Sequence, residues 1–190
     1  MSQAMRVLLY AVLLVLAGSA PPLRADPQAW GKSVNGLRIS ISLDQTGHPD
    51  SRVPGFRVDF RNRSDRDYGL HLGLMAGIGK YPRALFLIIR DAQGKSRRFD
   101  LIKPAGILGH INPFVVRLPV RGTYSVPVNL DDYWVVLSKE PNYKLTPGTY
   151  DIQARFIGTD DVAESGPGAL PLWTGTVVSN HLRFEITQQQ

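Results

Sequence analysis

The sequence predicts an all-β fold, an antiparallel β-sandwich formed by a single domain. Most apolar segments alternate apolar and polar residues with a period of two, as Phe56, Val58 and Phe60 do. That period places the apolar side chains of an extended segment on one face, as a half-buried antiparallel strand requires. Turn residues such as Asn35-Gly36 separate these segments, and no long segment has the 3.6-residue period of an α-helix.

We expect about seven to nine strands in this sandwich. The expected strands are 37–43, 56–61, 70–74, 85–90, 96–101, 115–118, 126–130, 150–156 and 182–186. Residues 91–95 carry turn chemistry and are expected to close a hairpin. Pro119 and Pro127 limit their strands to sheet edges or ends, because proline has no N–H to donate to a neighbouring strand.

Two segments carry other local signals. Residues 131–135 are expected to form the one helical turn, with Asp131 as its cap. The glycine-rich run 73–80 resembles a phosphate-binding loop only superficially. That motif needs glycine where Leu74 stands and a hydroxyl where Tyr81 stands. We therefore expect a flexible loop at 73–80.

The N-terminus has the organisation of a signal peptide. Arg6 lies in a short n-region, an apolar run follows at 7–17, and small residues come next. The run is too short for a permanent transmembrane helix, which needs about 20 apolar residues. Cleavage after Ala20 or after Ala25 is compatible with the sequence, and we favour Ala25. The domains are then a signal peptide at 1–25, a sandwich at 26–187 and a disordered tail at 188–190, in a secreted or periplasmic protein.

Composition excludes several functional classes. The chain has no cysteine, so disulfides, thiol catalysis and thiolate metal sites are absent. After loss of the signal peptide, 20 basic and 16 acidic residues remain, a net charge of +4. The two signs alternate along the strands, whereas a nucleic-acid-binding protein gathers its basic residues on one face. We therefore expect no nucleic-acid partner and no stable membrane insertion.

The turns and strands near two positions resemble a known family. The run Leu145-Thr146-Pro147-Gly148-Thr149-Tyr150 resembles the entry to the sixth strand of immunoglobulin-like sandwiches. The strand at 56–61 and the turn Asn62-Arg63-Ser64-Asp65 look like their counterparts in bacterial secreted immunoglobulin-like domains. The resemblance implies an immunoglobulin-like Greek-key β-sandwich in which the Tyr150 hydroxyl bonds back to the backbone. A looser similarity links the chain to the sandwich inhibitors of bacterial intracellular proteinases.

No residues form a recognisable catalytic, cofactor or metal motif. No Gly-x-Ser-x-Gly elbow is present, and the histidines have no metal-ligand spacing with one another or with acids. The histidines are His48, His71, His110 and His181. We therefore expect a protein that is not an enzyme and uses no cofactor.

Two loops are the candidate recognition surface. In a Greek-key sandwich, the long insertion at 158–175 shares one end with the loop 62–67. The candidate recognition residues are Arg63, Arg66, Asp160, Asp161, Glu164, Leu170, Leu172 and Trp173. In one interpretation Trp173, with Leu170 and Leu172, is an exposed apolar anchor, whose removal weakens binding without unfolding the domain. In the other, this apolar loop simply closes the end of the sandwich. The acids of the insertion also leave a calcium site open, although they lack the rhythm of a calcium loop.

The sequence thus favours an exported, non-catalytic binding or accessory domain. Its partner would be a protein or glycan in the envelope or outside the cell. Two alternatives remain at this point: a secreted hydrolase with a site assembled from loops, and a protease-inhibitor-like module with a projecting loop. An enzyme requires a concave site with perturbed acids or bases, whereas a binding module requires an exposed recognition surface.

Overall fold

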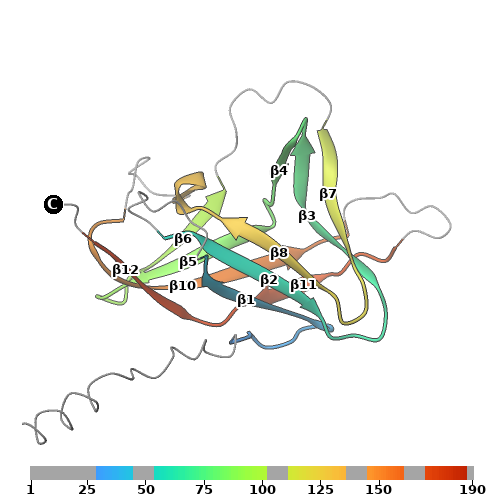
Figure 1. The fold of residues 1–190 in the computed structure, drawn as a ribbon, viewed down its shortest axis with the longest axis horizontal. Helices are drawn as coiled ribbons and strands as arrows, with labels where there is room; N and C mark the ends of the chain where they lie inside the picture. The colour runs from blue at the N-terminus through green and yellow to red at the C-terminus, as the bar shows by residue number, and fades with distance from the viewer. Residues whose placement is uncertain (1–28, 45–53, 102–110, 136–144, 161–169, 188–190) are drawn as a thin grey trace, which may run out of the picture.

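The computed structural model describes residues 29–44, 54–101, 111–135, 145–160 and 170–187. Within these residues the protein is all-β, with no α-helix (Figure 1). The strands are β1 (Leu37–Leu43), β2 (Phe56–Asn62), β3 (Tyr68–Ala76), β4 (Gly79–Tyr81), β5 (Leu85–Asp91), β6 (Ser96–Leu101), β7 (Ile111–Leu118), β8 (Thr123–Val128), β9 (Tyr133–Val135), β10 (Gly148–Gly158), β11 (Gly175–Val178) and β12 (Leu182–Ile186).

The strands form three antiparallel sheets. The first sheet has the order β1-β2-β8, and the second has the order β11-β10-β5-β6-β9, with β12 also paired to β10. The third sheet has the order β4-β3-β7. Pro127 lies in the edge strand β8, and β7, which ends just before Pro119, is also an edge strand, as their proline chemistry predicts.

The first and second sheets pack face to face around an aromatic core. Phe60 of β2 meets Phe156 of β10 edge-to-face, with ring centroids 5.2 Å apart. Phe56 of β2 meets Phe184 of β12 in the same way at 5.1 Å. These rings come from the apolar positions of the alternating segments. Each such pair contributes about 1 kcal/mol beyond the area it buries.

The third sheet belongs to the core at one end and projects from the body at the other. Leu70 and Leu72 at the base of β3 are fully buried, whereas Ile78, in the turn between β3 and β4, is fully exposed. In Figure 1 the arm of β3, β4 and β7 rises out of the body. A bulge between His71 and Gly73 separates the two parts of β3.

The prediction of a flexible loop at 73–80 is therefore wrong, because this run forms a hairpin. Ala76 pairs with Gly79, and the turn residue Gly77 has φ of +56°. Glycine adopts that angle without the clash of a Cβ atom. The sequence pattern missed the hairpin because small and apolar residues occupy both faces of the arm, so no period of two is visible.

The helical turn at 131–135 also needs correction. A 3₁₀ turn spans Leu130–Asp132, and its cap is Asn129, whose side chain accepts a hydrogen bond from the Asp131 N–H at 3.1 Å. Residues 133–135 are strand β9, paired with β6. Together with β4 and β11, β9 brings the described strands to twelve, above the seven to nine expected. Each of these three strands has only three or four residues, too few to show a period.

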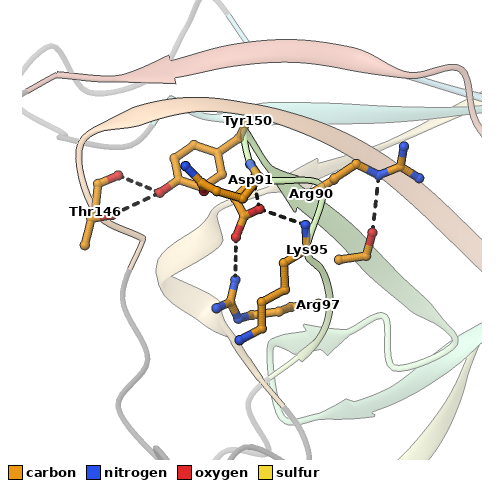
Figure 2. A network of polar contacts seen from close by, with 8 residues as sticks. Arg90, Asp91, Lys95, Arg97, Thr146 and Tyr150 are labelled. Atoms are coloured by element: carbon orange, nitrogen blue, oxygen red, sulfur yellow. Dashed lines mark hydrogen bonds and ion pairs between the residues drawn. The ribbon is translucent and has the colours of Figure 1, made fainter.

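Tyr150 has the hydrogen bond that the resemblance implies. Its hydroxyl donates to the backbone carbonyl of Thr146 at 2.7 Å (Figure 2). Its ring stacks on Phe184 at 5.5 Å. Close to it, the Asp91 carboxylate accepts from the backbone N–H of Lys95 at 2.8 Å and from the Arg97 guanidinium at 3.2 Å. Asp91 thereby closes the expected 91–95 hairpin between β5 and β6. The hydroxyl of Tyr150 fixes the entry into β10, the longest strand.

Replacing Tyr150 with phenylalanine should lower the free energy of unfolding by about 1–2 kcal/mol, because the buried ring stays but the Thr146 carbonyl loses its donor. Urea unfolding monitored by circular dichroism measures this change. Tyr124→Phe is the matched control, since the Tyr124 hydroxyl makes no hydrogen bond within the described part of the chain. Equal stability of wild type and Tyr150→Phe would contradict the role of the hydroxyl.

Candidate functional site

The loop 62–67 and residues 171–174, the described last part of the 158–175 insertion, border an open groove. The groove has a volume of about 680 Å³. One wall is the connection between β2 and β3, and the other is the segment that leads into β11. The lining residues are Asn35, Ser64, Asp65, Arg66, Tyr68, Pro171, Leu172, Trp173 and Thr174.

The first wall is held by the side chain of Asn62, which is fully buried. Its amide oxygen accepts from the N–H and the hydroxyl of Ser64, at 2.8 and 2.7 Å. Its amide nitrogen donates to the carbonyls of Arg66 and Leu118, at 2.8 and 3.1 Å. Both acceptor sites and both donors of the amide are therefore used, and the loop is fixed in one shape. The Asn-x-Ser sequence here has a structural role.

The far end of this loop is fixed by Asp67. Its carboxylate accepts hydrogen bonds from the Arg117 guanidinium, the shorter at 2.6 Å, and from the backbone N–H of Val120 at 2.9 Å. The hydrogen bond from Arg117, followed by that from Val120, holds the pKa of the Asp67 carboxyl below its usual value. The loop is thus anchored at Asn62 and at Asp67, and Ser64, Asp65 and Arg66 between them line the groove.

The second wall lies against β3 through backbone hydrogen bonds. The N–H of Gly69 donates to the Pro171 carbonyl at 2.9 Å, and the N–H of Trp173 donates to the Gly69 carbonyl at 2.9 Å. A Cβ atom on Gly69 would lie 2.8 Å from the Leu172 side chain. Glycine at this position therefore permits the close approach of the two segments.

Trp173 lies in the core, and its expected role as an exposed anchor does not fit this position. Its side chain is 3% exposed. The indole stacks on Phe156 at 5.6 Å, and its N–H donates to the carbonyl of Asn35 at 3.1 Å. The side chain thus forms the floor of the groove. Burial also raises the pKa of Tyr68 above its ordinary value, and its hydroxyl donates to the Gly36 carbonyl at 3.3 Å.

The structure places the other predicted recognition residues in different surroundings. Arg66 and Leu172 line the groove, whereas Arg63 is exposed outside it. Leu170 is half-buried over Gly69, and Asp160 is exposed beyond the end of β10. Asp161 and Glu164 lie outside the described residues. Within the described ranges, no three acids or histidines gather where they could hold a metal ion.

Sequence reasoning missed several lining residues. They are Asn35, Ser64, Asp65, Tyr68, Pro171 and Thr174. Asn35 and Ser64 belong to turns that the sequence marked, but turn chemistry does not reveal what a turn faces. The two turns lie together because Gly36 packs closely against Ser64. A Cβ atom added to Gly36 would lie only 2.6 Å from the Cβ of Ser64.

Comparisons with known proteins assign no family to the chain. No family model and no curated protein matches it. A solved structure described as the X-ray structure of Northeast Structural Genomics Consortium target SoR45 is 16% identical, and the match covers 80% of this chain and 88% of that one. Its TM-score of 0.39 is too low to carry an argument. In the described part of the chain, no helix has the length and apolar character needed to span a membrane.

Replacing Asn62 with alanine should lower the free energy of unfolding by about 2–3 kcal/mol, because buried backbone groups of the first wall lose their partners. Differential scanning calorimetry measures the effect. Asn112→Ala, a substitution at an exposed asparagine of β7, is the control and should leave the stability unchanged. A loss in Asn62→Ala no larger than in the control would show that the amide does not hold the loop.

Replacing Trp173 with alanine should lower the free energy of unfolding by about 3–5 kcal/mol, the usual cost of removing a buried aromatic side chain. Leu172→Ala, one residue earlier and half-buried, should cost only about 1 kcal/mol. Chemical denaturation of both variants makes the comparison. If Trp173→Ala is as stable as the wild type, the side chain does not support the core, and the prediction of an exposed anchor stands.

Proposed function

We propose that this protein is an exported, non-catalytic binding domain that recognises an envelope or extracellular protein through the groove. The observation that carries the proposal is the groove itself, which lies where the candidate recognition loops meet. Export is inferred from the signal-like sequence of residues 1–25. The immunoglobulin-like Greek-key assignment is supported by the face-to-face sheets and by the Tyr150 hydrogen bond.

The groove has the properties of a prepared binding surface. Its walls are fixed by Asn62, Asp67 and the backbone contacts of Gly69, so a partner would not have to order them. Rigid surfaces bind more tightly because less conformational entropy is lost on association. The exposed charges of Asp65 and Arg66 lie beside the apolar edge of Leu172. Such a mixture is typical of surfaces that recognise proteins.

A protein segment fits the groove better than a glycan does. Sugar-binding sites generally offer the open face of an aromatic ring, against which a pyranose stacks. The two aromatic residues of the groove, Tyr68 and Trp173, are each only 3% exposed. Their rings pack in the core, so neither offers an open face to a sugar, and the charged side chains of Asp65 and Arg66 remain exposed for contact with a peptide.

A second candidate function is favoured by one observation, the hairpin of β3 and β4. Ile78 is fully exposed at its tip, between Gly77 and Gly79. A projecting apolar residue of this kind suits insertion into the cleft of another protein, as in a protease-inhibitor-like module. The hairpin and the groove involve different residues, so one experiment separates the two functions.

Site-specific photo-crosslinking in the cells that make the protein tests the proposal. A benzophenone amino acid is placed at Thr174 in the groove, at Ile78 on the hairpin, or at Gln93 in the 91–95 turn as a control. We expect one protein partner to crosslink at Thr174 and to be lost in Leu172→Ala and Arg66→Ala, variants that keep the fold. Binding energy concentrates in a few such residues, so we expect each variant to weaken binding at least tenfold.

Other crosslinking results would change the assignment. Crosslinking only at Ile78, abolished by Ile78→Asp, would establish the inhibitor-like function in place of the groove. Capture at all three positions alike would indicate nonspecific contact and would contradict both functions.

A further inference from the structure

Two arginines lie directly opposite each other on the first sheet. Arg38 of β1 pairs with Arg61 of β2 in the antiparallel register. Their neighbours Leu37 and Asn62 are fully buried, so both arginines project from the outer face. Side chains at opposite positions of a ladder lie about 5 Å apart at their Cβ atoms, and like charges there destabilise the sheet.

Trp30 holds both guanidinium groups at this position. The Arg38 guanidinium lies 4.5 Å from the centre of a Trp30 ring, and that of Arg61 lies 5.9 Å from it. The tryptophan is itself fixed by its neighbour Gly31, whose N–H donates to the Ile39 carbonyl at 2.9 Å. The cation–π contacts orient the two arginines, but they supply no negative charge.

No carboxylate neutralises these arginines within the described part of the chain. The ion pairs found there all involve other arginines. The Nε atoms of Arg38 and Arg61 are buried and have no hydrogen-bond partner. Asp59, on the same strand, is paired with Arg57 and accepts from the Ser125 hydroxyl.

Arg63 adds a third positive charge to the same region. It follows Arg61 by two residues, and its exposed side chain makes no ion pair with the described residues. Burial, followed by the charges of Arg63 and Arg61, lowers the pKa of the Arg38 guanidinium. Because the cations are close enough to influence one another, an anion placed between them would interact with more than one.

We propose that Arg38 and Arg61, held by Trp30, form with the nearby Arg63 a binding site for a doubly charged oxyanion, a phosphate or a sulfate ester. The planar guanidinium fork matches two oxygens of such a group, and a dianion has enough oxygens to bridge two forks. Binding pairs accessible guanidinium N–H groups with oxygens and offsets the repulsion across the ladder. None of the four residues lines the groove, so this site is separate from the proposed recognition function.

Titration of the full-length chain with inorganic phosphate tests the site. Two-dimensional NMR spectra of the arginine Nε–Hε groups are recorded at constant ionic strength, with chloride replaced stepwise by phosphate. We expect saturable shifts of the Arg38 and Arg61 signals, with a dissociation constant in the millimolar range or below. Sulfate should act similarly, and acetate, which carries one charge, should bind at least about tenfold more weakly.

Three substitutions make the result specific to these arginines. Arg38→Gln and Arg61→Gln should each weaken phosphate binding by about tenfold or more, and Arg38→Lys should also weaken it because the charge remains but the fork is lost. Arg83→Gln removes an exposed arginine between β4 and β5 and should leave the affinity unchanged. The melting temperature of each variant confirms that it is folded.

The proposal is overturned if phosphate shifts no arginine signal beyond the chloride control, or if Arg83→Gln weakens binding as much as Arg61→Gln. The source of the anion is distinguished by two further probes, a sulfated oligosaccharide and vesicles containing phosphatidic acid. Competition of either probe with inorganic phosphate identifies a glycan or a lipid headgroup as the carrier, and competition by neither identifies free phosphate.

Discussion

The contacts of Phe156 connect the sheets of this protein to its groove. Its ring meets the edge of Phe60 from the opposite sheet on one side and stacks on Trp173 on the other. Trp173 then donates to the carbonyl of Asn35, next to the start of β1. In a chain without cysteine, aromatic packing of this kind must join the two sheets, since no disulfide does so. The position of the groove floor is therefore determined by the same side chains that form the core.

The strands with clear alternation were predictable to within a few residues. Segments 37–43 and 182–186 have the bounds of β1 and β12, because their apolar and polar residues alternate. Segment 96–101, expected from the hairpin turn at 91–95, has the bounds of β6. Apart from the 91–95 hairpin, pairing between strands was not predicted, because alternation shows which face is buried but not which strand lies beside it. The hairpin of β3 and β4 was missed for a related reason, since the arm projects from the core and has no buried face to set a period.

The candidate site was predictable in location and not in detail. The sequence led us to expect that the loop 62–67 and the 158–175 insertion share one end, and residues of 62–67 and of the segment before β11 line the groove together. The role of Trp173 could not be predicted from the sequence, because the residues around a loop tryptophan do not show whether its ring faces solvent or the core. Gly158 and Gly175 pack against the indole in the structure. A Cβ atom at Gly158 would lie 2.6 Å from the indole.

The arginines of this protein differ in how their charge is balanced. Arg97, Arg98 and Arg117 have an acid within ion-pair distance, as do Arg57 and Arg183, so five of the nine arginines in the described strands are paired. Arg38 and Arg61 instead face each other over Trp30. Exposed ion pairs contribute at most about 1 kcal/mol each, so stability alone does not demand an acid at this position. The opposed charges of Arg38 and Arg61, whose buried Nε donors have no partner, also lower the stability. An arrangement that costs stability and is held in place by an aromatic ring has its simplest explanation in a ligand that supplies the missing negative charge.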